Sequence, residues 1–265
     1  MPRNMTKLGQ HFLVDSYTID AIVRLVLQGA SGSLLEIGPG LGALTLPLAE
    51  RGHAVTAIEL DNTLIPRLQK RIGDKAPLTI IEGDALQFDF ASLPGAPWRL
   101  FGNLPYQISA LLMIALGAHR DKIDRMVFMV QKEVAERLAA VPNTSAYGRL
   151  TVMVQAWCHI EIVLAVPPRC FQPPPQVDSS VFVATPTPRA STTGLDWDVF
   201  ARVVARAFRH KRKMCYRSFA DYMAISVWEE IGLSRADRPS AISVEQYIQL
   251  THHLQQLSGE QLASI

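Results

Sequence analysis

The stretch FGNLPYQIS, residues 101–109, places an amide side chain, a proline and a tyrosine in close succession. The side-chain oxygen of Asn103 and the backbone carbonyl of Leu104 can accept hydrogen bonds from the two N–H groups of one planar amine. Pro105 favours the extended conformation that holds this carbonyl in place. Tyr106 adds an aromatic face on which an extruded base can stack. A β-turn with a buried tyrosine is the simpler alternative for a motif this short.

These residue types suit a reaction in which a weak nitrogen nucleophile attacks a methyl sulfonium. The exocyclic amine of adenine, like an amide nitrogen, is a poor nucleophile because its lone pair is delocalised. Two acceptors aimed at its N–H bonds would rehybridise the nitrogen and orient it. The nitrogen can lose its proton after the attack, so no strong base is required. The stretch contains no histidine or lysine, in agreement with such a reaction.

A glycine-rich turn precedes that stretch, in LLEIGPGLGALTL, residues 34–46. Gly38, Gly40 and Gly42 follow an apolar run typical of a strand and come before a helical pattern. Glycines at such a turn let the backbone approach a ligand closely, and the helix that follows offers free N–H groups. The turn alone is ambiguous, because Gly38, Gly40 and Ala43 also satisfy the dinucleotide-binding pattern and because a plain tight turn has the same composition.

Acidic residues follow at the ends of the next two predicted strands. Glu59 lies near the end of AVTAIEL, where it can accept hydrogen bonds from both hydroxyls of a ribose. Asp84, in IIEGDAL, is placed to meet an adenine amine. Either carboxylate alone is more simply a helix cap or a solvated strand end. Because the carboxyl ends of parallel strands share one edge, glycine, acid and acid together favour an adenosine without a pyrophosphate, and S-adenosylmethionine fits them better than NAD.

The elements that must position these residues alternate between strand and helix. The periodicity predicts helices over residues 17–28, 42–52, 62–72 and 110–118, and strands over residues 33–37, 54–60, 77–83, 98–102 and 125–131. Such alternation is typical of a Rossmann-like, doubly wound α/β sheet with helices on both faces.

A change in composition marks a domain boundary after this region. Pro, Thr and Ser accumulate over residues 184–198, and apolar periodicity ends there. We expect a catalytic domain over residues 1–187, a linker over 188–196 and a small all-helical domain over 197–265. In the last of these, Ser243 and Gln246 match a capping box that begins a helix.

The bulk composition is that of a globular protein with a mild positive charge. Of the 265 residues 48% are hydrophobic, and the formal charge is +2, so the distribution of charge matters more than its sum. Cys158, Cys170 and Cys215 have neither disulfide nor metal-site spacing and indicate packing thiols in a reducing compartment. The first residues lack the apolar core of a signal peptide, and the apolar runs are too short to span a bilayer. We expect a cytoplasmic protein without a metal site.

Positive charge gathers in the predicted helical domain. Residues 199–220 contain seven Lys or Arg and no Asp or Glu. On one helix, spacings of three and four would align Arg202, Arg206, Arg209, Lys213 and Arg217 in a stripe. Such a stripe is typical of a surface that binds a phosphate backbone, although a solvated helix face is the usual explanation of a charge run.

The order of these motifs resembles that of the ribosomal small-subunit RNA adenine dimethyltransferases. The resemblance extends over nearly the whole chain, through LGQHFLVD, LLEIGPGLGALT, IELD, EGDAL, GNLPYQIS, MVQKEVAERL, YGRLTVMVQ, FQPPPQVDSSV and the basic segment near Phe208. It implies the fold of the class I S-adenosylmethionine-dependent methyltransferases. It also implies conversion of two adjacent adenines near the 3′ end of that RNA to N6,N6-dimethyladenine.

The resemblance also implies roles for individual residues. The implied cofactor contacts are His11, Leu13, Gly38, Gly40, Glu59, Asp84 and Asn103. His11 would make a backbone contact or cover the methionine moiety, whereas composition alone makes it a surface histidine. Phe171 would face Tyr106 across the target base, although it also fits a core aromatic. The implied RNA contacts are Arg209, Lys211, Arg212, Lys213 and Arg217, while a role for Tyr216 is left open because the family pattern differs there.

Three other functions are compatible with parts of the sequence. A protein-glutamine N-methyltransferase presents a similar motif, but Leu104 and the basic domain argue against it. A ribosome-assembly factor in which methylation is secondary is permitted. An NAD-dependent dehydrogenase is the weakest alternative, since no hydride acceptor site is visible. The expected partner is small-subunit rRNA in a partly assembled particle, bound by a monomer.

Overall fold

A computed structural model describes residues 11–29, 32–73, 77–257 and 261. The start of the LGQHFLVD motif, residues 8–10, lies outside the described residues. The chain divides into two compact units, one made of residues 1–135 and 160–186 and the other of residues 136–159 and 187–265.

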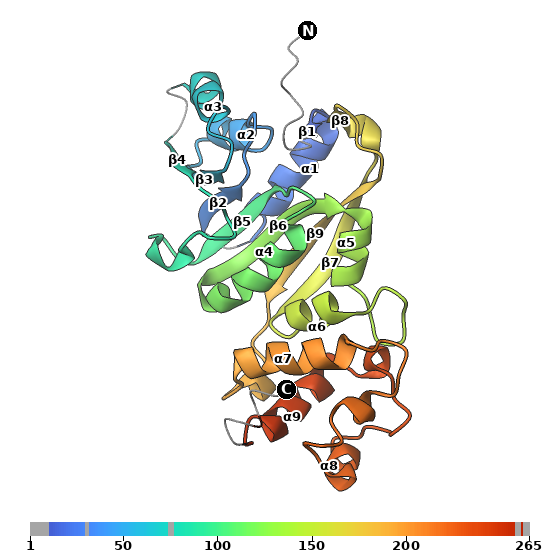
Figure 1. The fold of residues 1–265 in the computed structure, drawn as a ribbon. Coiled ribbons are helices and arrows are strands. Elements are labelled where there is room, and N and C mark those ends of the chain that lie inside the picture. Colours follow the sequence, from blue (N-terminus) through green and yellow to red (C-terminus); the bar gives the residue numbers. More distant parts are fainter. Residues whose placement is uncertain (1–10, 30–31, 74–76, 258–260, 262–265) are drawn as a thin grey trace. The chain divides into compact units, whose positions relative to one another are not determined.

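The first unit is built on a seven-stranded sheet (Figure 1) with the order β4-β3-β2-β5-β6-β9-β7. Strands β4, β3, β2, β5 and β6 are parallel, and β9 returns antiparallel to β6. The strand bounds are β2 Ser33–Ile37, β3 Val55–Glu59, β4 Leu78–Glu82, β5 Trp98–Asn103, β6 Ile123–Gln131, β7 Cys158–Val166 and β9 Ser179–Pro186. The five parallel strands predicted from the sequence are therefore confirmed.

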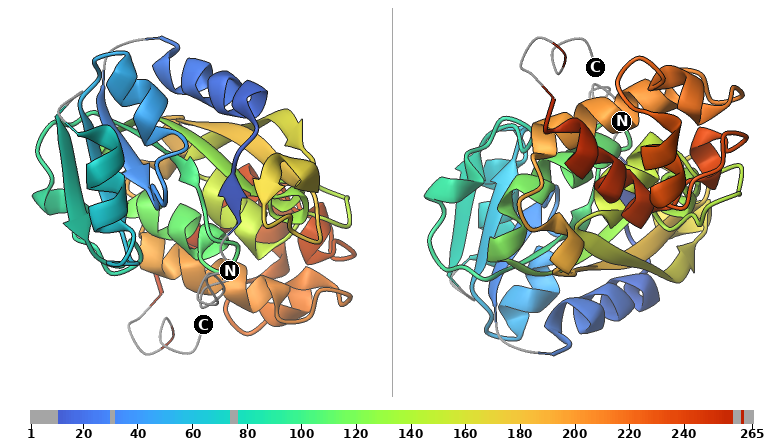
Figure 2. Two further views of the ribbon diagram at one scale, coloured as in Figure 1. Left: turned by 90° about the horizontal axis from the view of Figure 1, so that it is seen from above. Right: turned by 90° about the horizontal axis from the view of Figure 1, so that it is seen from below.

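Helices cover both faces of this sheet, with α1 and α2 on one face and α4 on the other (Figure 2). The helices are α1 Ser16–Leu27, α2 Thr45–Glu50, α3 Ile65–Ile72 and α4 Ser109–Leu116, and α5 Lys132–Leu138 spans the division between the units. Asp15 begins α1 by accepting a 2.8 Å hydrogen bond from the Thr18 N–H. Helix α2 starts later than predicted because Gly42, with φ of 84°, cannot continue a right-handed helix.

A two-stranded antiparallel sheet, not predicted from the sequence, joins β1 (Phe12–Leu13) to β8 (Phe171–Gln172). Two residues are too few to show strand periodicity, so only the structure reveals this pairing. It brings the residues around His11 next to the segment that follows Cys170, although the two segments lie far apart in the sequence.

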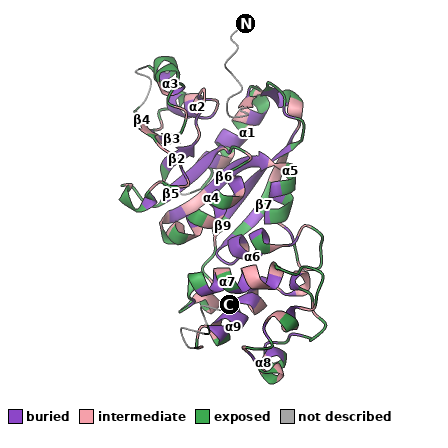
Figure 3. Cartoon of the chain, viewed as in Figure 1, coloured by how far each residue is buried: buried purple, intermediate pink, exposed green. Residues whose placement is uncertain are grey.

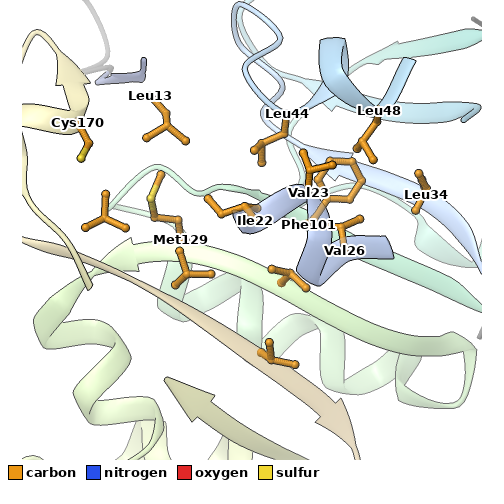
Figure 4. Close-up of a cluster of buried hydrophobic side chains, with 14 of the residues drawn as sticks. Leu13, Ile22, Val23, Val26, Leu34, Leu44, Leu48, Phe101, Met129 and Cys170 are labelled. Carbon is orange, nitrogen blue, oxygen red and sulfur yellow. The ribbon is translucent and has the colours of Figure 1, made fainter. Parts of the chain in front are cut away.

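Much of the sheet consists of buried residues (Figure 3). Buried apolar side chains fill the space between α1, α2 and the sheet (Figure 4). Ile22, Val23 and Val26 of α1 pack in one cluster with Leu48 of α2 and Phe101 of β5. Full burial of such a side chain contributes about 1.5–3 kcal/mol to folding. The same layer therefore fixes β5, and with it the residues at its carboxyl end.

The second unit is helical and contains α6 (Arg149–Gln155), α7 (Trp197–Phe208), α8 (Ile225–Glu230) and α9 (Val244–Leu254). The capping box of α9 is confirmed, since Ser243 Oγ accepts from the Gln246 N–H at 3.2 Å and Gln246 Oε1 accepts from the Ser243 N–H at 3.0 Å. Among the described residues no helix combines the length and apolarity needed to cross a membrane. Short 3₁₀ turns of the two units are Phe90–Ser92, Gly117–Lys122, Pro168–Cys170, Ala190–Thr192, Cys215–Ser218 and Pro239–Ala241.

The division into units differs from the predicted domains in two segments. Residues 136–159 group with the C-terminal helices, because the apolar side chains of α6 are buried and α6 contacts α7 and α9. The expected linker, residues 188–196, packs in the second unit, where Ser191 Oγ donates to Glu245 Oε2 at 2.9 Å. The change of unit after residue 186 lies next to the predicted boundary at 187.

Candidate functional site

The glycine turn follows β2 at the carboxyl edge of the parallel sheet. Gly38, Gly40 and Gly42 have φ of 69°, 56° and 84°, a left-handed conformation that residues with a Cβ rarely adopt. A Cβ built on Gly38 would meet no atom within 4 Å, so the space beside this backbone is open. The main chain of the turn is therefore accessible at Gly38.

Helix α3 supports this turn from one side. Arg71 Nη1 donates to the Leu41 carbonyl at 2.6 Å. Leu68 packs so closely against Gly42 that a Cβ there would collide with its side chain. These contacts hold the middle of a segment whose glycines would otherwise leave it many conformations.

Glu59 connects the end of β3 to the same turn. Its Oε2 accepts from the Gly40 N–H and its Oε1 from the Asp61 N–H, both at 2.9 Å. The side chain is 6% exposed, and burial raises the pKa of its carboxyl. Because each carboxylate oxygen has a second lone pair, Glu59 can still accept the two ribose hydroxyls predicted from the sequence.

A second carboxyl, Glu36, lies on β2 just before the turn and was missed by sequence reasoning. It is 2% exposed and accepts a hydrogen bond of 2.6 Å from Thr45 Oγ1 of α2. Burial raises its pKa to about 8, with a smaller contribution from the negative charge of Glu59. The signal in the sequence was an acidic residue inside an otherwise apolar strand.

Asp84 follows β4 by two residues and is half-buried. Its Oδ1 accepts from the Leu86 N–H at 2.9 Å, and its Oδ2 accepts from Gln87 Nε2 at 3.1 Å. Asp84 therefore closes a local turn, whereas the simpler alternative from the sequence was a helix cap. The remaining lone pairs of its carboxylate are compatible with the predicted contact to an adenine amine.

Leu60, which the sequence analysis did not single out, adds an apolar surface to this edge of the sheet. It follows Glu59 directly and is 58% exposed, which is unusual for a leucine. An exposed apolar side chain beside the carboxylate predicted to hold a ribose can pack on the face of a purine. We define the cofactor rim as Gly38, Gly40, Glu59, Leu60 and Asp84.

Asn103 ends β5, the strand beside β2. Its Nδ2 donates to the His11 backbone carbonyl at 3.1 Å, and among the described residues its Oδ1 receives no hydrogen bond. The amide is thus oriented with its acceptor oxygen available. Gly102 makes this position possible, since a Cβ there would collide with the carbonyl oxygen of Ile37 at the end of β2.

The residues after Asn103 form a short turn that leads into α4. Leu104 is buried, and its N–H donates to the Met129 carbonyl at 3.0 Å. Tyr106 is half-buried, and its hydroxyl lies 3.2 Å from Ser179 Oγ. The imidazole of His11 stacks on the Tyr106 ring, with centroids 6.0 Å apart and planes at 28°. His11 and Tyr106, predicted for separate roles, therefore meet.

Leu13 and Phe171, the remaining predicted site residues of this unit, lie in the hydrophobic core. They pair in the small sheet of β1 and β8, and both are 4% exposed. The burial of Phe171 agrees with the core alternative. That Phe171 faces Tyr106 across a bound base stays a prediction.

The basic residues of the second unit do not form one helical stripe. Helix α7 ends at Phe208, and the chain turns through residues 209–214, so the expectation of a single helix is wrong. Arg206 is used structurally, because its Nε donates to the Ser218 carbonyl at 2.5 Å and its guanidinium lies 4.7 Å from the Tyr222 ring centroid. The predicted RNA contacts are all exposed: Arg209, Lys211, Arg212, Lys213 and Arg217.

Tyr216, whose role was left open, packs within the second unit. Its ring meets the edge of Trp228 at a centroid distance of 5.6 Å, and the guanidinium of Arg235 lies 5.6 Å from its centroid. The side chain is half-buried. These contacts give Tyr216 a packing role.

Comparison with known proteins identifies the family. Residues 1–256 match the model of the ribosomal RNA adenine dimethylase family. The chain belongs to this family. It is 44% identical over 252 residues to the ribosomal RNA small subunit methyltransferase A of Psychromonas ingrahamii, covering 94% of this chain and 93% of that protein. It is 43% identical over 248 residues to the protein of the same name from Shewanella oneidensis, covering 93% and 92%.

A solved structure of the same family agrees with the fold. The crystal structure of a dimethyladenosine transferase from Plasmodium falciparum superimposes with a TM-score of 0.79 at 26% identity, covering 93% of this chain and 98% of that one. The predicted fold, that of the S-adenosylmethionine-dependent methyltransferases, is confirmed. Membership of this family makes S-adenosylmethionine the cofactor. The open backbone at Gly38 and the buried carboxylate of Glu59 fit its adenosine.

Proposed function

We propose that this chain transfers methyl groups from S-adenosylmethionine to the N6 amines of two adjacent adenines near the 3′ end of small-subunit rRNA, forming N6,N6-dimethyladenine. The orientation of Asn103 is the observation that carries this proposal. Because the His11 carbonyl takes the Asn103 Nδ2 donor, the Oδ1 acceptor is left for an N–H of the adenine amine. A pocket built for a carbonyl substrate would need a donor at this position instead.

The cofactor supplies the electrophilic methyl group when bound, and the protein supplies orientation. Glu59 and the glycine turn hold the adenosine, and the hydrogen bond from the Gly40 N–H to the Glu59 carboxylate already fixes the turn. Asn103 Oδ1 and the Leu104 carbonyl accept the two N–H bonds of the amine, so that the lone pair of the nitrogen points towards the methyl group. After the transfer the nitrogen carries positive charge until it loses a proton, and the acceptor oxygens stabilise that charge.

Two acceptors also explain how the same amine can be methylated twice. After the first transfer the nitrogen keeps one N–H, which either acceptor can hold while the new methyl group replaces the other hydrogen. Tyr106 retains the base by stacking in both rounds. The exposed residues Arg209, Lys211, Arg212, Lys213 and Arg217 bind phosphates and position the RNA without choosing the base.

The product identifies this function directly. The protein is incubated with labelled S-adenosylmethionine and undermethylated small subunits, and the RNA is then digested to nucleosides. We expect label in N6,N6-dimethyladenosine at two neighbouring positions. Label in protein glutamine would instead support the glutamine N-methyltransferase, and binding of the particles without any labelled nucleoside would support an assembly factor alone.

The partner and the surroundings form a further part of the proposal. We propose that a monomer acts in the cytoplasm on rRNA within a partly assembled particle. The support is that Cys158, Cys170 and Cys215 are all buried free thiols, as expected in a reducing compartment. Sedimentation of the free protein, and a comparison of methylation of naked RNA with that of assembled and partly assembled subunits, would test these statements.

A further inference from the structure

One hydrogen bond joins the side chain of Tyr106 to the sheet. The Tyr106 hydroxyl lies 3.2 Å from Ser179 Oγ. Ser179 is the first residue of β9, the strand between β6 and β7 (Figure 1). The proposed reaction uses the ring of Tyr106 as a stacking surface but neither its hydroxyl nor Ser179.

The hydroxyl of Ser179 is buried in an apolar part of the sheet. Ser179 is 1% exposed, and residues 180–184 of the same strand are buried as well. Burying a hydroxyl costs free energy unless it is hydrogen-bonded, whereas an alanine would fill the same place without that cost. Tyr106 is the recorded side-chain partner of Ser179 within the described residues. The contact with Tyr106 therefore explains why a serine occupies this position.

The backbone on both sides holds Ser179 in place. Ser179 pairs with Gln131 at the end of β6, and the Lys132 N–H donates to the Asp178 carbonyl at 3.0 Å. Tyr106, by contrast, is half-buried in the turn between β5 and α4. Its ring can rotate about two side-chain bonds, so a fixed partner at the hydroxyl end of the ring restricts that rotation.

We propose that Ser179 is a positioning residue, whose hydroxyl holds the ring of Tyr106 in the plane on which the target adenine stacks. Ser179 does not touch the substrate and acts through Tyr106 alone. This inference rests on the proposed function and deepens it, because it names the group that orients the stacking surface before the base arrives.

The second methyl transfer depends on this ring more than the first. An unmethylated amine offers two N–H bonds to the acceptors of Asn103 and Leu104, and a monomethylated amine offers one. With one hydrogen bond fewer to orient the base, a larger part of its alignment comes from stacking on Tyr106. Loss of the Ser179 hydroxyl should therefore slow the second transfer more than the first, so that N6-methyladenosine accumulates.

A double-mutant cycle with one control tests this role. Ser179→Ala removes the partner, and Tyr106→Phe removes the hydroxyl that the partner holds while keeping a ring for stacking. The double variant completes the cycle. Ser180→Ala is the matched control, because Ser180 is a 4% exposed serine of the same strand whose side chain points to the opposite face of the sheet.

The measurements are the single-turnover rates of both transfers on undermethylated small subunits, the ratio of monomethylated to dimethylated adenosine, and the dissociation constant of S-adenosylmethionine by calorimetry. We expect Ser179→Ala and Tyr106→Phe each to slow the second transfer about two- to tenfold, the size expected for the loss of one hydrogen bond. The double variant should be no slower than the slower single variant. Ser180→Ala should match the wild type, and cofactor affinity should stay within about twofold in every variant.

Other results overturn the inference. Wild-type rates and product ratios in Ser179→Ala, equal slowing of both transfers, or a double variant slowed by the product of the two single effects would exclude an action through Tyr106. Equal losses in Ser179→Ala and Ser180→Ala, or weaker cofactor binding in Ser179→Ala, would indicate a general disturbance of β9. If Ser179→Ala does not fold, Tyr106→Phe decides alone, since normal dimethylation by that variant contradicts the inference. If the wild type forms no dimethyladenosine, the proposed function itself fails, which is a different result from an active wild type with an insensitive Ser179→Ala variant.

Discussion

The cofactor rim of the first unit and the basic segment of the second, residues 209–217, are built in opposite ways. The rim combines the main chain of the glycine turn with the side chains of Glu59, Leu60 and Asp84. The Gly40 N–H donates to Glu59, and Arg71 donates to the Leu41 carbonyl of the turn. The basic segment consists of long exposed side chains on turns that follow α7. The rim is thus ordered before its ligand arrives, and its binding energy depends little on salt. The basic segment adapts to its ligand and depends on salt strongly.

The largest effect on kcat is expected at Asn103, which we propose acts on the reacting amine rather than in either binding surface. Asn103→Ala removes an oriented acceptor from the transition state and should lower kcat by about a hundredfold or more. Binding of the particle should change far less. Single-turnover methylation and particle binding, measured on the same preparation, check this. Near-normal turnover would show that the motif around Asn103 has only a structural role.

Glu59→Ala tests whether the rim depends on its buried carboxylate. If Glu59 binds the ribose as proposed, the substitution removes two hydrogen bonds, each worth about 1.5–3 kcal/mol. It also frees the Gly40 N–H. Calorimetry should show at least a tenfold loss of S-adenosylmethionine affinity. Glu82 is the matched control, since it pairs with Glu59 on the neighbouring strand but is exposed. Equal affinities for Glu59→Ala and Glu82→Ala would contradict the assignment.

The basic segment should show the opposite response. Replacing Arg209, Lys211, Arg212 and Lys213 together by Ala should weaken RNA binding and reduce the log–log salt slope by about one unit for each lost phosphate contact. Cofactor affinity and the choice of adenine should persist. As a control, Arg67 and Lys70, two exposed cations of α3, are replaced in the same way. An unchanged salt slope in the quadruple variant would show a solvated surface only.

Glu36 links the rim to the pH dependence of stability. In the folded protein its pKa of about 8 lies above the ordinary value of 4.5. Its contribution to the free energy of unfolding is therefore complete below pH 4.5 and is lost as the pH rises through 8. In Glu36→Gln this dependence should vanish. The variant should therefore gain stability relative to the wild type by up to about 1.4 kcal/mol per pH unit within that window. Urea unfolding at several pH values measures this. If the free energies of unfolding of the wild type and the variant changed in parallel with pH, the prediction would be wrong.

The smallest effect is expected at Arg71, which acts on the rim from outside. Its hydrogen bond to the Leu41 carbonyl is exposed and contributes about 0.5–1.5 kcal/mol, so Arg71→Ala should raise the KM for S-adenosylmethionine roughly two- to tenfold. The kcat at saturating cofactor and the KM for the particle should not change. Lys70→Ala, one residue away, should have no effect. A fall in kcat with unchanged KM would mean that Arg71 does not act through the turn.

The sequence predicted what depends on local pattern. The alternation of apolar strands and helices predicted the sheet. It also predicted that the glycines, Glu59, Asp84 and Asn103 lie at the carboxyl edge of the parallel strands, where we propose the site. The pairing of Phe12–Leu13 with Phe171–Gln172 was not predictable, because it joins two residues to two others far along the chain. The position of Phe171 in the core, and the contact of His11 with Tyr106, follow from that pairing.

The remaining differences also have non-local causes. Residues 136–159 join the second unit because α6 is apolar around most of its surface and needs α7 and α9 to cover it. The spacing of Arg202, Arg206 and Arg209 suggested one helical stripe, but α7 ends at Phe208. Arg206 instead holds the Ser218 carbonyl. Charge spacing describes a helix face only as far as the helix continues.

Gly102 lets the end of β5 pass against the Ile37 carbonyl with no side chain between the two strands. The distance between the strand that leads to the glycine turn and the strand that ends in Asn103 is therefore set by main chain alone. Substitutions of side chains cannot change the distance between β2 and β5 without displacing a strand of the core. Related proteins would therefore differ in substrate through residues around the base pocket and in the second unit. The distance between the methyl donor and the amine that accepts the methyl group would stay constant.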